Sequence, residues 1–201
     1  MLASGSGTDL QSILDAIDSG YIRDAKVSAV VSNNRDAYAL ERAKKHGADA
    51  IYIDHRGKPR EQHEQEIIEA IEPYNPDLIV LAGYMRALTP DFIRHYRGRI
   101  INIHPALLPL FGGKGYYGER VHKAVLESGI KVSGCTVHFV TEDVDGGPII
   151  LQRCVPIMDD DTVETLAARV LEEEHRCLPE AVKLFIEGRV RMEDGRTVIE
   201  R

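Results

Sequence analysis

An amide and an imidazole stand two residues apart near the middle of the chain, at Asn102 and His104. The run from Arg99 to Ile103 predicts a short strand, in which these two side chains point to the same face of a sheet. α/β sheets bind ligands beyond the carboxyl ends of their strands, and an amide beside an imidazole can stabilise and protonate a developing oxyanion. The pair therefore predicts a catalytic site.

Asp145, in the segment Asp145–Pro148, is the carboxylate that we expect to join this pair. Spacing alone leaves other interpretations open. Asp145 and its two glycines also fit an ordinary turn, and Asn102 and His104 also fit a strand end at which they only satisfy exposed backbone groups. Asp145 acts in catalysis only if it closes on His104 within hydrogen-bond reach.

The segment Ser4–Leu10 is a loop of small residues that opens directly into a helix. Such a loop leaves backbone N–H groups and the positive end of the helix dipole facing an anion, so it predicts a phosphate site. A tight turn in which Thr8 or Asp9 only caps the helix fits equally well. Because only Met1–Ala3 precedes the loop, we expect the first strand to be cut short, since such loops normally follow a strand of about five residues.

Bulk properties limit the class of protein. With 201 residues, of which 43% are hydrophobic and 28% charged, the chain can bury the core of one domain. A net charge of −7 argues against a nucleic-acid partner but allows a local phosphate pocket. The sequence has no long apolar run and no leader, so we expect neither membrane insertion nor export.

The cysteines and histidines also bear on the class of protein. An odd number of separated cysteines predicts reduced thiols in a cytoplasmic protein. No zinc-binding spacing of cysteines or histidines occurs, so we expect no metal.

Helical and strand patterns alternate through the first half of the chain. Helix-then-strand pairs are predicted at 10–17 and 27–31, 36–46 and 50–53, 60–72 and 78–81, and 90–96 and 100–101. Alternation of this kind predicts an α/β fold with a doubly wound, mostly parallel sheet and helices on both faces.

The second half has a different pattern. Residues 106–118 are rich in glycine and predict a mobile loop before a helix at 119–127. Strands are expected at 132–140 and 149–155, and a C-terminal hairpin at 189–192 and 197–199. Between them, 162–188 reads as a helical region whose apolar face is Val163, Leu166, Val170 and Leu171. Pro179 predicts either a kink in it or a break between two helices.

Taken together, these motifs resemble the folate-dependent formyltransferases, most closely those that formylate glycinamide ribonucleotide. The resemblance runs from Leu2 to about Arg191 and rests on Ser4–Thr8, Val31–Asn33, Leu81–Arg86, Asn102–Pro109, His138–Val140 and Asp145–Gln152. It implies a single Rossmann-like formyltransferase domain over 1–201, with a phosphate-binding half at 1–101 and a catalytic and folate-binding half at 102–201.

The same resemblance implies a site. The phosphate of glycinamide ribonucleotide is expected on Gly7, Thr8 and Asp9, with Glu174 near its amine. Asn102, His104 and Asp145 match the catalytic trio of the family. The co-substrate 10-formyltetrahydrofolate is expected against Arg60, Met85, Arg86, Ala87, Leu88, Asn102, Thr141, Glu142, Asp143 and Val144. Acyl transfer of this kind requires no metal, and a homodimer is left open.

Some positions depart from the family pattern or keep a plainer interpretation. Asp9 stands where many relatives have asparagine, which favours a backbone or capping role for it. The glycine-rich loop before the helix at 119–127 is longer than in several relatives, so the alignment of His122 with a loop histidine of the family is only partial. The run Glu172–Glu174 would ordinarily be a solvated helix face, and surface solvation is the plain interpretation of Arg60 and Arg86. His138 is expected to be a packed or hydrogen-bonded histidine rather than a catalyst.

Two other enzyme activities and a binding module are the alternatives to formyl transfer to the ribonucleotide. Hydrolysis of formyltetrahydrofolate uses the same chemistry with water as the acceptor, but relatives with that activity usually carry an added N-terminal domain. Formylation of methionyl-tRNA generally uses an extra basic C-terminal domain. A phosphate- or nucleotide-binding module without catalysis would leave the pairing of Asn-x-His with Asp-Gly-Gly unexplained.

Overall fold

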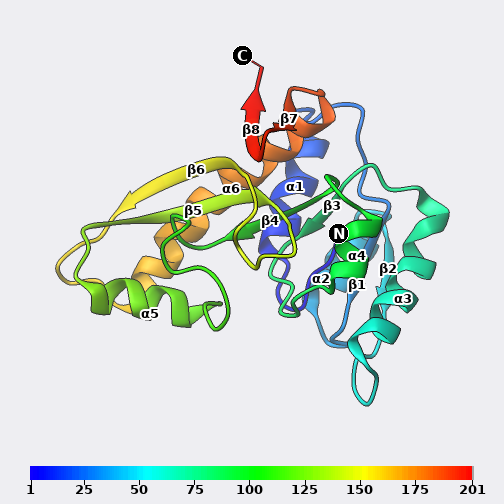
Figure 1. Ribbon diagram of the computed structural model, residues 1–201, viewed down its shortest axis with the longest axis horizontal. Helices are drawn as coiled ribbons and strands as arrows, with labels where there is room; N and C mark the ends of the chain where they lie inside the picture. The colour runs from blue at the N-terminus through cyan, green and yellow to red at the C-terminus, as the bar shows by residue number, and fades with distance from the viewer. Residues whose placement is uncertain (201) are drawn as a thin grey trace. The chain divides into compact units, whose positions relative to one another are not determined.

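The computed structural model describes residues 1–200 and divides into two compact units, Met1–Ile101 (unit 1) and Asn102–Arg201 (unit 2). Figure 1 labels the elements of both. Unit 1 alternates helices with strands in the order α1 (Thr8–Asp18), β1 (Ala29–Ser32), α2 (Tyr38–Lys45), β2 (Asp49–Tyr52), α3 (Arg60–Ile71), the 3-10 turn Glu72–Tyr74, β3 (Ile79–Leu81) and α4 (Pro90–His95). Strand β4 (Ile100–His104) begins in unit 1 and ends in unit 2.

Parallel pairing joins the strands of unit 1, as their alternation with helices predicts. β1 and β2 are parallel, in register from Ala29 opposite Asp49 to Ser32 opposite Tyr52. Leu2 forms parallel bridges to both Val31 of β1 and Leu81 of β3. The carboxyl ends of these strands therefore open on the same edge as the loop that follows Leu2.

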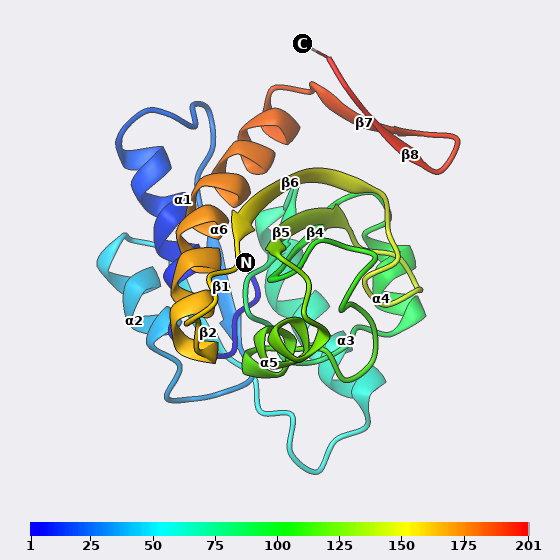
Figure 2. The same cartoon turned by 90° about the vertical axis from the view of Figure 1, so that its left-hand side faces the viewer.

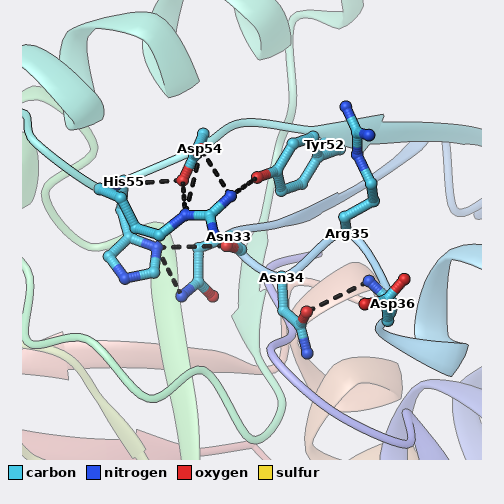
Figure 3. A pocket seen from close by; sticks show the side chains of 8 residues that line it. Asn33, Asn34, Arg35, Asp36, Tyr52, Asp54 and His55 are labelled. Carbon is cyan, nitrogen blue, oxygen red and sulfur yellow. Dashed lines mark hydrogen bonds and ion pairs between the residues drawn. The ribbon is translucent and has the colours of Figure 1, made fainter.

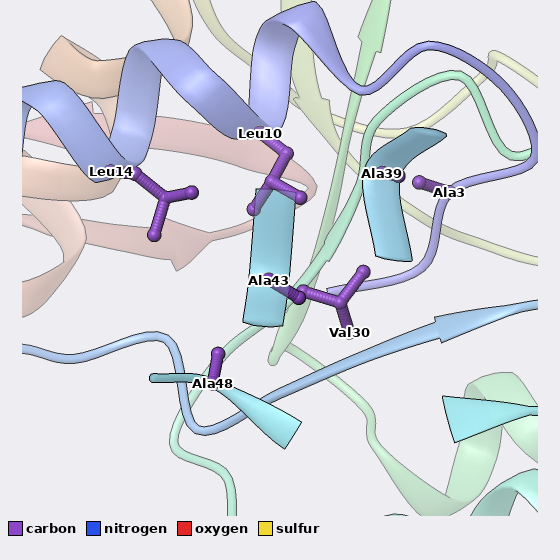
Figure 4. Close-up of a cluster of buried hydrophobic side chains, with 7 residues drawn as sticks. All are labelled: Ala3, Leu10, Leu14, Val30, Ala39, Ala43 and Ala48. Atoms are coloured by element: carbon purple, nitrogen blue, oxygen red, sulfur yellow. The ribbon is translucent and has the colours of Figure 1, made fainter. Parts of the chain in front are cut away.

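Small side chains let α1 and α2 approach β1 closely. A buried cluster joins α1, α2 and β1, with Leu10 directed toward Ala43 and Val30 (Figure 4). Its members are Ala3, Leu10, Leu14, Val30, Ala39, Ala43 and Ala48. Gly7 belongs to the same close contact, because a Cβ there would lie 2.8 Å from Cα of Ala39.

Unit 2 is built on antiparallel strands that make the sheet mixed. After β4 come α5 (Glu119–Ser128), β5 (Val132–Phe139), β6 (Ile149–Pro156), α6 (Val163–Ile186), β7 (Val190–Glu193) and β8 (Arg196–Ile199). β5 and β6 are antiparallel with β5 next to β4, and α6 packs on both β5 and β6 (Figure 2). The predicted C-terminal hairpin is confirmed, because β7 and β8 pair antiparallel.

Helix α6 runs without interruption through Pro179, so the predicted alternative of two separate helices is wrong. Proline removes one backbone hydrogen bond, but the buried inner face continues on both sides of it and holds the helix together. That face includes Leu166, Val170, Glu174, Cys177 and Leu178. The expectation of a solvated face at Glu172–Glu174 is wrong for Glu174, which lies one turn after Val170 on the buried side.

Within residues 1–200, none of the helices is long and apolar enough to cross a membrane.

Candidate active site

His104 and Asp145 meet within unit 2. His104 ends β4 and is only 4% exposed, and Asp145 lies in the turn between β5 and β6. The Nδ1 atom of His104 is 3.7 Å from Oδ2 of Asp145. This is an ion-pair distance and is longer than a hydrogen bond, as is common at catalytic pairs before a ligand binds.

Steric constraints explain the two glycines after Asp145. Asp145 itself has a positive φ of 58°. A Cβ on Gly146 would come within 2.1 Å of the Asp143 carboxylate, and one on Gly147 would lie 1.8 Å from the carbonyl oxygen of Phe139. The segment is therefore a tight turn, as one interpretation predicted, and the same turn directs Asp145 toward His104.

His138 contacts both Asn102 and Asp145. Its Nδ1 is 2.9 Å from the Phe139 carbonyl oxygen, which can only accept, so Nδ1 carries the proton and donates. Nε2 lies 3.2 Å from the Nδ2 amide of Asn102 and 3.6 Å from Oδ1 of Asp145. His138 is thus hydrogen-bonded, as expected, but its link to two members of the trio was missed.

The glycine-rich loop closes over the trio through its backbone. The Phe111 carbonyl accepts from Nε2 of His104 at 2.8 Å, and the Gly113 N–H donates to Oδ2 of Asp145 at 2.8 Å. Between them, a Cβ on Gly112 would meet the Leu108 side chain at 2.4 Å. A ligand oxygen that binds His104 must therefore take the place of the Phe111 carbonyl.

Burial sets the protonation states of this pair. Burial lowers the pKa of His104 below its ordinary value of 6.5, although Asp145 and the Phe111 carbonyl oppose that shift. Burial raises the pKa of Asp145, but His138, His104 and the Gly113 N–H outweigh it, so the pKa lies below its usual range. At neutral pH the pair consists of a neutral imidazole and an ionised carboxylate.

His122 lies on the first turn of α5 and is only 6% exposed. Its Nδ1 atom has no hydrogen-bond partner among residues 1–200. Burial lowers the pKa of His122, and the charge of His104 lowers it further, so the two rings lie within electrostatic reach of each other. The structure therefore places His122 in unit 2, the same unit as His104 and Asp145.

Two polar residues that the sequence analysis missed hold the loop after His104. Thr136 of β5 donates to the Ala106 carbonyl at 2.6 Å and accepts from the Leu108 N–H at 3.0 Å. Gln152 of β6, its cross-strand partner, donates to the Leu108 carbonyl at 2.9 Å. The available signal was a hydroxyl between the hydrophobic residues Cys135 and Val137 on a predicted strand.

The N-terminal loop is formed by backbone geometry. Gly7 is the N-cap of α1, with φ 71° and no side-chain cap hydrogen bond, so the alternative in which Thr8 or Asp9 caps the helix is wrong. Asn33 accepts from Ser4 Oγ at 2.7 Å, and Arg42 donates to the Ser6 carbonyl at 2.9 Å. Burial raises the pKa of Asp9 to about 6.

The expected folate residues are divided between the two units. In unit 1, Arg60 is exposed at the start of α3, and the segment Met85–Leu88 follows β3 with Met85 54% exposed. Arg86 is half-buried, so surface solvation does not describe it, and its Nε atom has no partner among residues 1–200. In unit 2, Thr141–Val144 lies in the β5–β6 turn, where Glu142–Val144 are exposed and the half-buried Thr141 donates to the Asp143 carbonyl at 3.2 Å.

Across the part of the chain that the structure describes, no group of three or more His, Cys, Asp or Glu side chains is arranged to hold a metal ion.

Comparison with known proteins gives matches over nearly the whole chain. The family model for formyl transferases matches residues 1–182. The phosphoribosylglycinamide formyltransferase of Escherichia coli (strain K12) is 43% identical over 196 residues, which are 97% of this chain and 90% of that protein.

Solved structures give the same picture. Glycinamide ribonucleotide transformylase 1 from Symbiobacterium toebii has a TM-score of 0.93 at 48% identity, covering 100% of this chain and 92% of that chain. A formyltetrahydrofolate deformylase from Pseudomonas syringae pv. tomato has a TM-score of 0.90 at 28% identity, covering 100% of this chain but 64% of that chain.

Proposed function

The chain belongs to the formyl transferase family, and within it to the phosphoribosylglycinamide formyltransferases, and from this premise we propose that it formylates glycinamide ribonucleotide. The donor is 10-formyltetrahydrofolate, and the products are formylglycinamide ribonucleotide and tetrahydrofolate. The reaction is a step of de novo purine biosynthesis. The observation that carries the proposal is the match with relatives of this activity along almost the whole chain.

The reaction is a direct acyl transfer. The amine of the ribonucleotide attacks the formyl carbon, a tetrahedral oxyanion forms, and the N10 nitrogen of the folate leaves with a proton. We assign stabilisation of the oxyanion to Asn102 and His104, because both can donate hydrogen bonds from the end of β4. His138 supports this role as a positioning residue, since its contact with Nδ2 of Asn102 fixes how the amide is turned.

Proton transfer falls to His104 and Asp145. The buried imidazole is neutral before reaction, so it must gain a proton before it acts as the general acid. The attacking amine carries a surplus proton once its bond to the formyl carbon has formed. In our proposal Asp145 collects that proton through water and passes it to His104, which delivers it to N10.

Substrate binding is the less direct part of the proposal. The backbone N–H groups of Gly7, Thr8 and Asp9 hold the phosphate at the start of α1, with Glu174 near the amine. Folate lies against Arg60, the segment Met85–Leu88, Asn102 and the turn Thr141–Val144. Support comes from the positive φ of Gly7 and from the exposure of the turn Glu142–Val144.

Several further features belong to the same proposal. The full doubly wound arrangement, with helices on both faces of a mostly parallel sheet, is supported by the parallel pairing in unit 1. We expect the enzyme to need no metal ion, because direct acyl transfer does not require one. A cytoplasmic location is supported by free thiols at Cys135, Cys154 and Cys177. A homodimer stays an open expectation.

One assay separates the candidate functions. The protein is incubated with glycinamide ribonucleotide and a 10-formyl folate, and a parallel sample receives the folate and water alone. We expect tetrahydrofolate to form only when the ribonucleotide is present, in equal amount to the formylated product. Release of formate in the water sample at the same rate would assign the chain to hydrolysis, the activity named for the P. syringae deformylase. No turnover in either sample would leave only a binding module.

A further inference from the structure

A polar cleft of about 380 Å³ lies beyond the carboxyl ends of β1 and β2 in unit 1 (Figure 3). Two loops form its walls, residues 33–36 after β1 and residues 54–56 after β2, together with Tyr52 at the end of β2. Every residue that lines it is polar or charged, and none is used in the proposed formyl transfer. This edge of a parallel sheet is where α/β folds bind ligands, and the volume is that of a small-molecule site.

Some of the charges in the cleft are already paired. Arg56 binds Asp54 through two bonds, Nε to Oδ1 at 3.0 Å and Nη2 to Oδ2 at 2.9 Å. His55 uses Nδ1 against the Asn33 carbonyl at 3.2 Å. These contacts fix the two loops and leave the Arg56–Asp54 pair with no net charge.

Other groups in the cleft have no protein partner. Arg35 stacks its guanidinium over the Tyr52 ring at 5.3 Å from the centroid, and within residues 1–200 it makes no hydrogen bond or ion pair. The Asp36 carboxylate likewise has no partner there, although its backbone N–H donates to Asn34 at 3.1 Å. A free cation and a free anion therefore stand on adjacent residues at the mouth of one cleft.

We propose that this cleft binds a sugar phosphate. A guanidinium fork matches the oxygens of a phosphate, and its stacking on Tyr52 holds it in place without using its donors. A free carboxylate such as Asp36 accepts hydrogen bonds from sugar hydroxyls. A ligand that carries both groups satisfies Arg35 and Asp36 together, whereas a simple anion is repelled by Asp36.

The first experiment measures binding of ribose 5-phosphate by isothermal titration calorimetry. Glycinamide ribonucleotide is present at a concentration that fills the neighbouring phosphate loop but lies far below the dissociation constant expected for the cleft. It is needed because Asn34 donates to the Ser4 carbonyl at 3.4 Å, so the probe must not report on that loop, and the limit is needed because the ribonucleotide is itself a sugar phosphate. We expect a dissociation constant on the order of 1 mM, weakened about tenfold or more by Arg35→Ala. Arg23→Ala is the matched control, since this exposed arginine bonds, among residues 1–200, only to the Gly20 carbonyl at 3.4 Å. It should leave binding unchanged.

A second variant separates a sugar phosphate from a plain anion. Asp36→Asn should weaken ribose 5-phosphate severalfold, because the hydroxyls lose a charged acceptor, and should strengthen inorganic phosphate, because repulsion is removed. Both variants should keep the wild-type turnover number for formyl transfer.

Three results would overturn the proposal. The first is that ribose 5-phosphate does not bind while this lower concentration of the ribonucleotide fills the phosphate loop. The second is that Arg35→Ala binds it as wild type does. The third is that Asp36→Asn strengthens both probes, or that triglutamate binds as tightly as the sugar phosphate, either of which would make the cleft a general anion site. The turnover assay tests the proposed formyl transfer independently, so a wrong assignment of that activity is distinguishable from absence of binding in the cleft.

Discussion

The proposed catalytic residues in unit 2 and the proposed phosphate-binding loop in unit 1 are built differently. In unit 2 the buried side chains of His104 and His138, at 4% and 2% exposure, are already hydrogen-bonded around the half-buried Asn102 and Asp145. In unit 1 the N-terminal loop consists of backbone, with a left-handed Gly7 and no side-chain cap. Side chains that are held in advance act on the chemical step, whereas backbone donors at a helix end act on binding. We therefore expect changes in unit 2 to appear in kcat and changes in unit 1 to appear in KM or in stability.

Asp145→Asn is the change with the largest expected effect. It keeps the shape of the turn and an acceptor for the Gly113 N–H, but it removes the charge that faces His104. We expect kcat to fall about 10²–10³-fold with the melting temperature nearly unchanged. Steady-state kinetics and a thermal melt measure both quantities. Asp159→Asn, at an exposed residue paired with Lys131, is the control, and equal loss in that variant would remove the special role of Asp145.

The pH dependence of kcat/KM tests the protonation state in unit 2. Because burial holds the pKa of His104 below 6.5, the neutral ring predominates at pH 6.5 and above, and the cation predominates only below this lowered pKa. If the free enzyme must start with a neutral ring, kcat/KM should fall about tenfold per pH unit below the apparent pKa of the pair. NMR titration of the His104 ring would identify the group. A rate that keeps rising as the pH falls through this region would make the cation the starting form.

Gly7→Ala tests the backbone construction of unit 1. Both Gly7 and Gly20 have positive φ values, 71° and 74°, but a Cβ on Gly20 meets nothing within 4 Å. Gly20→Ala should therefore cost only the left-handed backbone, about 1–2 kcal/mol of the free energy of unfolding. Gly7→Ala should cost more, because its Cβ would lie 2.8 Å from Ala39. Denaturant unfolding gives both values, and equal losses would show that the contact with Ala39 does not matter.

Asp9→Asn should give the smallest effect. With a pKa raised to about 6, Asp9 is ionised at neutral pH and repels the phosphate that we place on this loop. The asparagine variant should lower the KM for glycinamide ribonucleotide severalfold at neutral pH, and the difference should vanish about one unit below the pKa, where Asp9 is protonated. A KM advantage that persists at acid pH would mean that charge is not its cause.

The raised pKa of Asp9 also fixes how the difference in stability between Asp9→Asn and wild type changes with pH. A raised pKa in the folded state means that Asp9 stabilises the fold fully at low pH and loses that contribution as the pH rises through about 6. The variant should therefore gain stability over wild type as the pH increases.

Local patterns predicted much of this molecule. The alternation of helices and strands predicted the elements of unit 1, and the helix expected at 90–96 begins at Pro90, where Thr89 accepts from the Phe92 N–H. The spacing of Asn102 and His104 depends only on strand geometry, and it was visible for that reason.

Features that depend on distant contacts were not predictable. The need for glycine at Gly7 arises from Ala39, far along the chain. The orientation of Asn102 arises from His138, and the continuity of α6 through Pro179 arises from a buried face on both sides of it. Tyr52 and Arg35 meet because β1 and β2 pair in parallel, which brings their following loops together.

A double-mutant cycle tests most directly whether His104 and Asp145 work as one unit. Single-turnover rates of formyl transfer are measured for wild type, His104→Ala, Asp145→Asn and the double variant. If one proton path passes through both groups, the double variant should be about as slow as the slower single variant. Losses that multiply across the two substitutions would show that the residues act independently and would contradict the account.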